Sequence, residues 1–328
     1  MTMSNRRQGG AALLMAMLTV TLVATFAAAA MWQQWRSIEV EQAERTRVQS
    51  GWILTGALDW VRLILREDNT SADYLSEPWA VPLEEARLST FLAAEQGVAT
   101  VSSGEDTMDA FLSGEIIDLQ SFLNVNNLVE GGVTSTSGML SFTRLFEVLG
   151  LPPAQLATLA ENLRFASDTS ADNQSSPMAP LLPQRVEQLV WLGLTPQTAA
   201  ALQPYVTLLP PQQAKTPVNL NTAKAEVIYA SVPGLSMADA QRLVAARDRA
   251  PFRSVDDARQ LVTGLDPAAF AGVGVASGFF ESRGRLRLGQ MVVEERSLLQ
   301  RVASNVRALQ RERGVIQAPP PGSTLPGR

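Results

Sequence analysis

The N-terminal fifth of the chain carries two successive hydrophobic patterns. From Ala11 to Trp32 every residue is apolar except three threonines. At about 1.5 Å of rise per residue, this segment is long enough to cross the roughly 30 Å hydrocarbon core of a bilayer. From Ile38 to Leu65, apolar residues recur at intervals of three, four and seven, which is the spacing of an amphipathic helix. Together the patterns predict one helix from residue 11 to about 67, with a membrane half and a soluble half.

The residues at the two ends of the apolar segment indicate its orientation. Arg6 and Arg7 precede it, and basic residues on one side favour a cytoplasmic location for that side. Trp32 and Trp35 follow it, where tryptophans gather at a membrane interface. The segment is longer than the roughly 7–15 apolar residues of a secretory signal peptide. The alanines at 27–30 leave open signal-peptidase cleavage, which would yield a secreted protein.

Strand-like patterns occupy two separate regions of the remaining chain. Segments 107–129 and 278–305 alternate apolar and polar residues, which indicates antiparallel strands. The asparagine-rich "NVNN" at 124–127 suggests a hairpin turn within the first region. Residues 314–328 are rich in proline and glycine and are expected to form a disordered tail.

Between these regions, repeated segments predict a block of helices. "LGLPPAQLATL", "LGLTPQTAAAL" and "PGLSMADAQRL" share a Gly-Leu pair, a following Ser, Thr or Pro, and an apolar periodic run; "TGLDPAAFAGV" is a weaker fourth copy. Glycine adopts the left-handed conformation that ends many helices, and Ser, Thr or Pro commonly opens the next one. We therefore expect Gly150, Gly193 and Gly234 at corners between consecutive helices.

The composition narrows the possible chemistry. The chain has 27 basic and 32 acidic residues and no cysteine or histidine. It therefore lacks thiolate nucleophiles, zinc–thiolate ligands and the usual general base near neutral pH. No spacing of carboxylates supports an acid–base pair in a cleft. We expect no enzyme activity and no small-molecule substrate.

The N-terminal pattern resembles a known family of fibre subunits. A basic leader that ends in glycine, followed by an apolar segment and a long amphipathic helix, is similar to a type IV pilin or pseudopilin. In that family a prepilin peptidase cuts after the glycine and the new N-terminus is methylated. The resemblance places this cut between Gly10 and Ala11. The fifth mature residue of the family is usually glutamate but is Met15 here, a departure typical of the K-type minor pseudopilin.

Three further segments make the resemblance more specific. "EPWAVP" at 77–82, "LNVNNLV" at 123–129 and the long "PVNLNTAKAEVIYASVPGLSMADAQRLVAARDRAPFRSVDDA" at 217–258 resemble the type II secretion system minor pseudopilin K (GspK family). The resemblance implies an α+β fold, in which a pilin-like long N-terminal helix packs on a small antiparallel sheet with a large all-α (SAM-like or helix-hairpin-helix-like) insert.

The same resemblance implies a cellular role. The protein would be anchored in the inner membrane by a single pass, with its N-terminus cytoplasmic and its bulk in the periplasm. It would assemble with the I-, J- and H-type minor pseudopilins at the tip of a periplasmic pseudopilus. Its function would be to initiate and cap this fibre for protein export across the outer membrane.

These expectations define a domain map and a partner surface. The amphipathic part of the N-terminal helix is expected to face the sister subunits through Ile38, Val48, Trp52 and Leu58, although the same stripe must also cover its own sheet. The map is a leader at 1–10, a transmembrane half-helix at 11–32, a pilin-like domain at 33–125 and 277–313, a helical insert at 126–276, and a tail at 314–328.

One segment also supports a different class of function. "VNLNTAKAEVIYASVPGLSMADAQRLVAARD" matches a helix-hairpin-helix pattern, which would suit a membrane-anchored DNA receptor (ComEA-like). Against this alternative, Ser236 replaces the second loop glycine that lets backbone N–H groups approach phosphate, and Asp239 would repel phosphate. We therefore expect no nucleic-acid partner. In this interpretation Asn219 and Asn221 cap a helix, and Leu235 packs between the hairpin helices.

Calcium is the one cofactor that the resemblance suggests. K-type subunits can hold calcium in an acidic loop, and the corresponding segment here is "ENLRFASDTSADNQSS" at 161–176. The candidate ligands are Asp168, Asp172 and Asn173. Calcium takes about six to eight oxygen ligands, so two clustered aspartates are few, and a solvated loop is the favoured alternative.

Overall fold

The computed structural model describes residues 9–68, 70–90, 110–168, 170, 179–211, 214–289 and 291–317. Two compact units divide the chain between Gly56 and Ala57. The first unit lies within helix α1 (Gly9–Glu67), whose last eleven residues belong to the second unit. The prediction of one uninterrupted helix that ends near residue 67 is confirmed, and the helix begins at Gly9, two residues earlier than expected.

The apolar part of α1 satisfies its own polar groups. The hydroxyls of Thr19, Thr21 and Thr25 donate to backbone carbonyls three or four residues earlier, at distances of 2.8–3.0 Å. These bonds satisfy side-chain hydroxyls that would otherwise require water, and a helix in hydrocarbon must satisfy its polar groups internally. The side chains from 11 to 32 are exposed, so this segment is apolar on every side.

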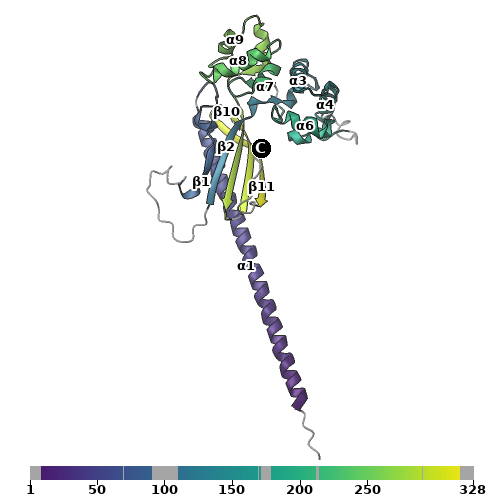
Figure 1. The fold of residues 1–328 in the computed structure, drawn as a ribbon, viewed down its shortest axis with the longest axis vertical. Coiled ribbons are helices and arrows are strands. Elements are labelled where there is room, and N and C mark those ends of the chain that lie inside the picture. The colour runs from purple at the N-terminus through teal and green to yellow at the C-terminus, as the bar shows by residue number, and fades with distance from the viewer. Residues whose placement is uncertain are drawn as a thin grey trace, which may run out of the picture. The chain divides into compact units, whose positions relative to one another are not determined.

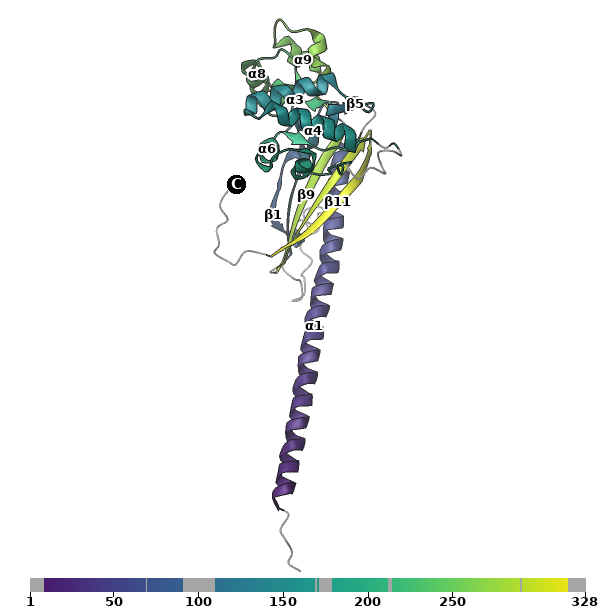
Figure 2. The same ribbon diagram turned by 90° about the vertical axis from the view of Figure 1, so that its right-hand side faces the viewer.

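An antiparallel sheet of five strands forms the centre of the second unit (Figures 1 and 2). Its order is β1-β2-β9-β10-β11, so β2 pairs with a strand that follows it by some 160 residues. The whole helical block is therefore an insertion between two neighbouring strands. The strands are β1 (Leu83–Arg87), β2 (Ala110–Asp118), β9 (Phe279–Leu288), β10 (Met291–Val302) and β11 (Asn305–Gln317).

One face of this sheet packs against the end of α1. Leu58, Val61 and Leu65 lie one helical turn apart and are buried with Phe280 and Leu299 of the sheet. Trp79, from the 3-10 helix η1 (Pro78–Ala80), closes this core and meets Phe280 edge-on, with ring centroids 5.2 Å apart. Each such side chain contributes about 1.5–3 kcal/mol through burial.

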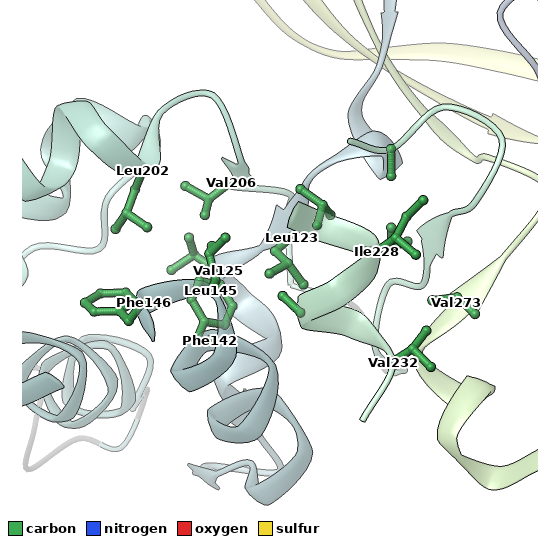
Figure 3. Packing of buried hydrophobic residues seen from close by; sticks show 14 of the residues in the cluster. Leu123, Val125, Phe142, Leu145, Phe146, Leu202, Val206, Ile228, Val232 and Val273 are labelled. Atoms are coloured by element: carbon green, nitrogen blue, oxygen red, sulfur yellow. The ribbon is translucent and has the colours of Figure 1, made fainter. Parts of the chain in front are cut away.

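The insert has its own hydrophobic core (Figure 3). Phe142 and Phe146 lie at its centre, and Leu123 connects it to the chain that leaves the sheet. Figures 1 and 2 show the insert at one end of the sheet. Its helices are α3 (Thr136–Leu149), α4 (Pro153–Ala166), η4 (Val186–Leu192), α6 (Pro196–Leu202), α7 (Ala225–Ser231), α8 (Met237–Arg247), α9 (Val255–Gln260) and η5 (Pro267–Gly272).

Short elements connect these helices to one another and to the sheet. Two parallel pairs, β3–β6 and β7–β8, join distant segments, and β4–β5 forms a small antiparallel pair. Their bounds, with the two 3-10 turns that follow β2, are η2 (Leu119–Ser121), β3 (Leu123–Asn124), η3 (Val125–Leu128), β4 (Val129–Glu130), β5 (Val133–Thr134), β6 (Val206–Thr207), β7 (Val218–Asn219) and β8 (Val273–Gly274).

The repeated Gly-Leu segments are helix corners, as the sequence predicts. Gly150, Gly193 and Gly234 have φ angles of 65°, 97° and 79°, in the left-handed region that favours glycine. Gly264, in the weaker fourth copy, has a φ of 86°. The next helix then begins at a proline or at a capping side chain; Ser236, for example, accepts a hydrogen bond from the backbone N–H of Asp239.

Two local expectations are wrong. The "NVNN" segment is not a hairpin turn: Asn124 is buried and its side chain accepts from the N–H of Asn126, so the chain turns into η3 and enters the insert. The segment from 314 does not begin as a tail, because β11 continues to Gln317. Val315 and Ile316 pair with β10, and the proline run that would prevent pairing starts only at 319.

Candidate assembly site

The candidate membrane anchor is the first part of the candidate assembly site. Helix α1 is the one helix in the described part of the chain that is long and apolar enough to cross a membrane. Gly10 and Ala11 lie in its first turn, and cleavage between them stays a prediction. Met15 is 71% exposed on this helix, so its apolar side chain faces outward.

Three of the four predicted partner residues are exposed on α1. Trp52 is 74% exposed, Val48 56% and Ile38 47%. Large apolar side chains at such exposure mark surfaces that another molecule can cover. Their role as partner contacts stays a prediction.

Leu58 requires a correction. Its side chain is only 6% exposed and packs in the core beneath the sheet with Leu65 and Phe280. A helical stripe that covers its own sheet over the last turns cannot also face a partner there. Leu58 itself is therefore not available to a partner.

The calcium candidates fall mostly outside the described residues. Asp172 and Asn173 both lie there, so calcium binding at this loop stays a prediction. Asp168 follows α4, and one of its carboxylate oxygens accepts from the backbone N–H of Ser170 at 2.9 Å. This bond lowers the pKa of Asp168. Glu161 is engaged by Arg164, at 2.6 Å.

The helix-hairpin-helix loop is built for packing within the insert. Leu235 is buried in the core, as expected, and its backbone N–H donates to the carbonyl of Val232. Arg144 of α3 donates to the carbonyls of Tyr229 and Leu235 and stacks on the Tyr229 ring at 3.9 Å. The loop amide of Leu235 and the nearby arginine are thus committed to the fold rather than directed towards phosphate.

A buried polar network joins the insert to the sheet. Asp118, at the end of β2, is 3% exposed and accepts from the side chains of Asn219, Thr222 and Ser277, and from the backbone N–H of Gln120. Asn219 and Thr222 belong to the insert, whereas Ser277 lies just before β9. Burial raises the pKa of Asp118, and these donors oppose that shift.

Asn219 is the insert's main contribution to this network, so its interpretation as a helix cap is wrong. The nitrogen of its side-chain amide, which has two hydrogens to donate, lies 2.9–3.1 Å from the carbonyl of Asp73, a carboxylate oxygen of Asp118 and the hydroxyl of Ser277. Helix α7 begins after Lys224 instead. Asn221 is not a cap either, because its side chain exchanges two hydrogen bonds with the backbone of Phe252.

Arg301 connects the same network to the end of α1. Its guanidinium, 10% exposed, lies 2.7 Å from Asp68 and 2.5 Å from Asp73, and it donates to the carbonyl of Ser277. Asp68 directly follows α1, and Asp73 lies in the loop after it. Helix end, sheet and insert are therefore held by one connected set of hydrogen bonds. Sequence reasoning missed this set, and the only available signal was "VNLN", whose asparagines were assigned to a local role.

Comparisons with known proteins agree with this architecture. Two family models, both described as "Type II secretion system (T2SS), protein K", match residues 121–211 and 218–276, which cover most of the insert. The type II secretion system protein K of Klebsiella pneumoniae is 26% identical over 339 residues, spanning 95% of this chain and 98% of that protein.

A solved structure shares the fold. It is the crystal structure of the GspK-GspI-GspJ complex from the enterotoxigenic Escherichia coli type 2 secretion system. The match has a TM-score of 0.62 at 18% identity and covers 83% of this chain and 98% of the chain in that structure. The long N-terminal helix, the antiparallel sheet and the helical insert thus form an α+β fold of this type, and over most of the insert the chain matches the protein K family of type II secretion systems.

Proposed function

We propose that this protein is the minor pseudopilin at the tip of a short periplasmic fibre, where it initiates and caps assembly for export across the outer membrane. The observation that carries the proposal is the position of the insert. It lies at the end of the sheet where α1 ends, since Arg301 at that end binds Asp68 directly after the helix. A further subunit stacked beyond this end would meet the insert instead of a pilin-like surface.

Met15 supports the same position. The family resemblance implies that, in stacking subunits, a glutamate at this place pairs with the N-terminal amine of a neighbouring subunit. An unpaired carboxylate in a bilayer costs about 2.5–3.5 kcal/mol on insertion scales. The first subunit of a fibre has no subunit ahead of it with which to form this pair. The apolar side chain of Met15 avoids the cost of an unpaired carboxylate in the bilayer.

The partners we propose are the I- and J-type minor pseudopilins, which the related crystal structure contains together with GspK. The surface that would bind them is the exposed stripe of α1 that includes Ile38, Val48 and Trp52. The inner membrane would hold the apolar half of α1, and a prepilin peptidase would remove residues 1–10.

Site-specific cross-linking tests the partner surface cleanly, because the chain contains no native cysteine. Trp52→Cys should form disulfide cross-links with sister pseudopilins that carry a cysteine at the matching depth of their N-terminal helices. Leu58→Cys is the matched control, because it lies on the same helix but is buried. Cross-linking from position 58 and none from position 52 would contradict the proposed surface.

Processing and capping need separate measurements. Intact mass after co-expression with the prepilin peptidase should correspond to a chain that starts at methylated Ala11; a chain that retains Arg6 and Arg7 would refute the assignment. Electron microscopy of assembled fibres labelled on the insert should show label at one end only. Label along the fibre would exclude a tip role.

A further inference from the structure

The polar network at the junction contains more carboxylates than cations. Asp73, Glu77 and Asp118 are at most 3% exposed, and the Asp68 side chain is 9% exposed. One carboxylate oxygen from each of Asp68, Asp73 and Glu77 lies within 4.8 Å of the others. Within the described residues, the cation that pairs with this group is Arg301. If every carboxyl were ionised, the cluster would carry a net charge of −3 in a buried place.

The cluster also has fewer hydrogen-bond donors than acceptors around the Thr70 hydroxyl. The hydroxyl of Thr70 lies 2.8 Å from Asp68, 2.7 Å from Glu77 and 2.9 Å from the carbonyl of Ala72. A hydroxyl has one hydrogen to donate, so it can serve only one of these three acceptors. An additional proton on one of the carboxyl groups would supply a second donor.

The carboxyl groups differ in the number of donors that reach them. Glu77 accepts from the backbone N–H of Tyr74 and the indole N–H of Trp79, as well as lying against Thr70. Asp118 accepts from four groups. Among the described residues, the carboxylate of Asp73 accepts from two groups, the backbone N–H of Ser277 and the guanidinium of Arg301. Asp73 thus depends on one cation, Arg301, which it shares with Asp68, and the neighbouring carboxylate of Asp118 disfavours its ionisation.

We propose that this junction is a proton-dependent lock: the folded protein retains a proton on the Asp68–Asp73–Glu77–Asp118 cluster at mildly acidic pH, and releasing it weakens the connection between the α1 end, the sheet and the insert. The groups that face Asp73 from the packed elements are Asp68 after α1, Glu77 in its own loop, Asp118 of β2, Arg301 of β10 and the neutral Asn219 of the insert. Neighbouring carboxyls of this kind titrate as a unit. This inference stands apart from the proposed tip position.

The direction of the effect follows from the pKa values. Burial raises the pKa of Asp73 to about 6, against the N–H of Ser277 and Arg301, and burial also raises that of Asp118. A carboxyl whose pKa is raised by folding contributes stability at low pH that is lost as the pH rises through the folded value. Burial acts to raise the pKa of Asp68 too, but Thr70 and Arg301 hold it below its ordinary value, so its opposite contribution is lost only in stronger acid.

The test is the stability of the full chain in detergent between pH 8 and pH 5. With a pKa of about 6 for Asp73, the folding equilibrium constant should rise about tenfold as the pH falls across this range. The chain has no histidine, so no ordinary side chain titrates near the middle of this window. Urea midpoints of the wild type that stay constant or fall towards pH 5 would overturn the proposal.

Two variants identify the group. Asp73→Asn should reduce the pH dependence, whereas Asp59→Asn, which neutralises an exposed aspartate of α1, should leave it as in the wild type. Equal pH profiles for wild type and Asp73→Asn would overturn the assignment. If Asp73→Asn does not fold, hydrogen exchange of the Ser277 and Gly278 amides in the wild type provides the test. After correction for intrinsic exchange rates, these amides should be more protected at pH 5 than at pH 8. The reverse order would refute the lock.

Discussion

Replacing Asn219 by alanine distinguishes a helix cap from a structural junction by magnitude alone. Loss of an N-cap costs about 1 kcal/mol of unfolding free energy. In the structure, Asn219 donates a hydrogen bond to the Asp118 carboxylate, and the alanine would remove this bond, which is worth about 1.5–3 kcal/mol. It would also leave the carbonyl of Asp73 and the N–H of Asn221 without this partner, at about 1–3 kcal/mol each. Allowing for relaxation, we expect a loss of at least about 3 kcal/mol.

The assay is urea unfolding of the detergent-solubilised chain, followed by tryptophan fluorescence at pH 7. Ser236→Ala provides a matched control, because Ser236 is a true N-cap in the same insert and accepts from the N–H of Asp239 at 3.1 Å. That variant should lose about 1 kcal/mol. If Asn219→Ala costs no more than Ser236→Ala, the junction does not hold the insert in the way we describe.

Three further tests concern the backbone and the N-terminal helix. Ala303 has a φ of 51° in the β10–β11 turn, so Ala303→Gly should stabilise the chain by about 1 kcal/mol. Ala238→Gly, within α8, should destabilise it by a similar amount. Urea midpoints that shift in the same direction for both variants would refute this prediction. At Gly193, where φ is 97°, an added Cβ would lie only 2.6 Å from a side chain of α4, whereas a Cβ at Gly150 would meet open space. Gly193→Ala should therefore lower the melting temperature more than Gly150→Ala. Equal shifts would contradict this prediction. Met15→Glu should reduce the assembled fraction of the subunit, measured by co-purification, and unchanged assembly would show that the apolar residue is not required.

Much of the secondary structure was readable from the sequence because local physics decides it. The apolar segment of α1 contains no residue that would interrupt a helix, so the length of this helical segment follows from its composition. The corners at Gly150, Gly193 and Gly234 require a left-handed backbone that other residues disfavour, so glycine followed by a capping residue identifies them. The pairing of β2 with β9, by contrast, joins segments separated by the whole insert. Alternation predicts strands but not which of them pair.

The residues that hold the insert could not be found in the same way. Asn219 has the local sequence of a helix cap, yet its side chain donates to Asp73, Asp118 and Ser277, which are 58–146 positions away along the chain. Leu58 has the spacing of a partner-facing stripe, and only the packing of the sheet against the last turns of α1 buries it. The sequence by itself determined the anchor, the helices and their corners, because those depend on neighbours within a few residues. The tertiary structure alone decided which polar groups are buried together, because hydrogen-bond partners and desolvation are set by segments that meet only after folding.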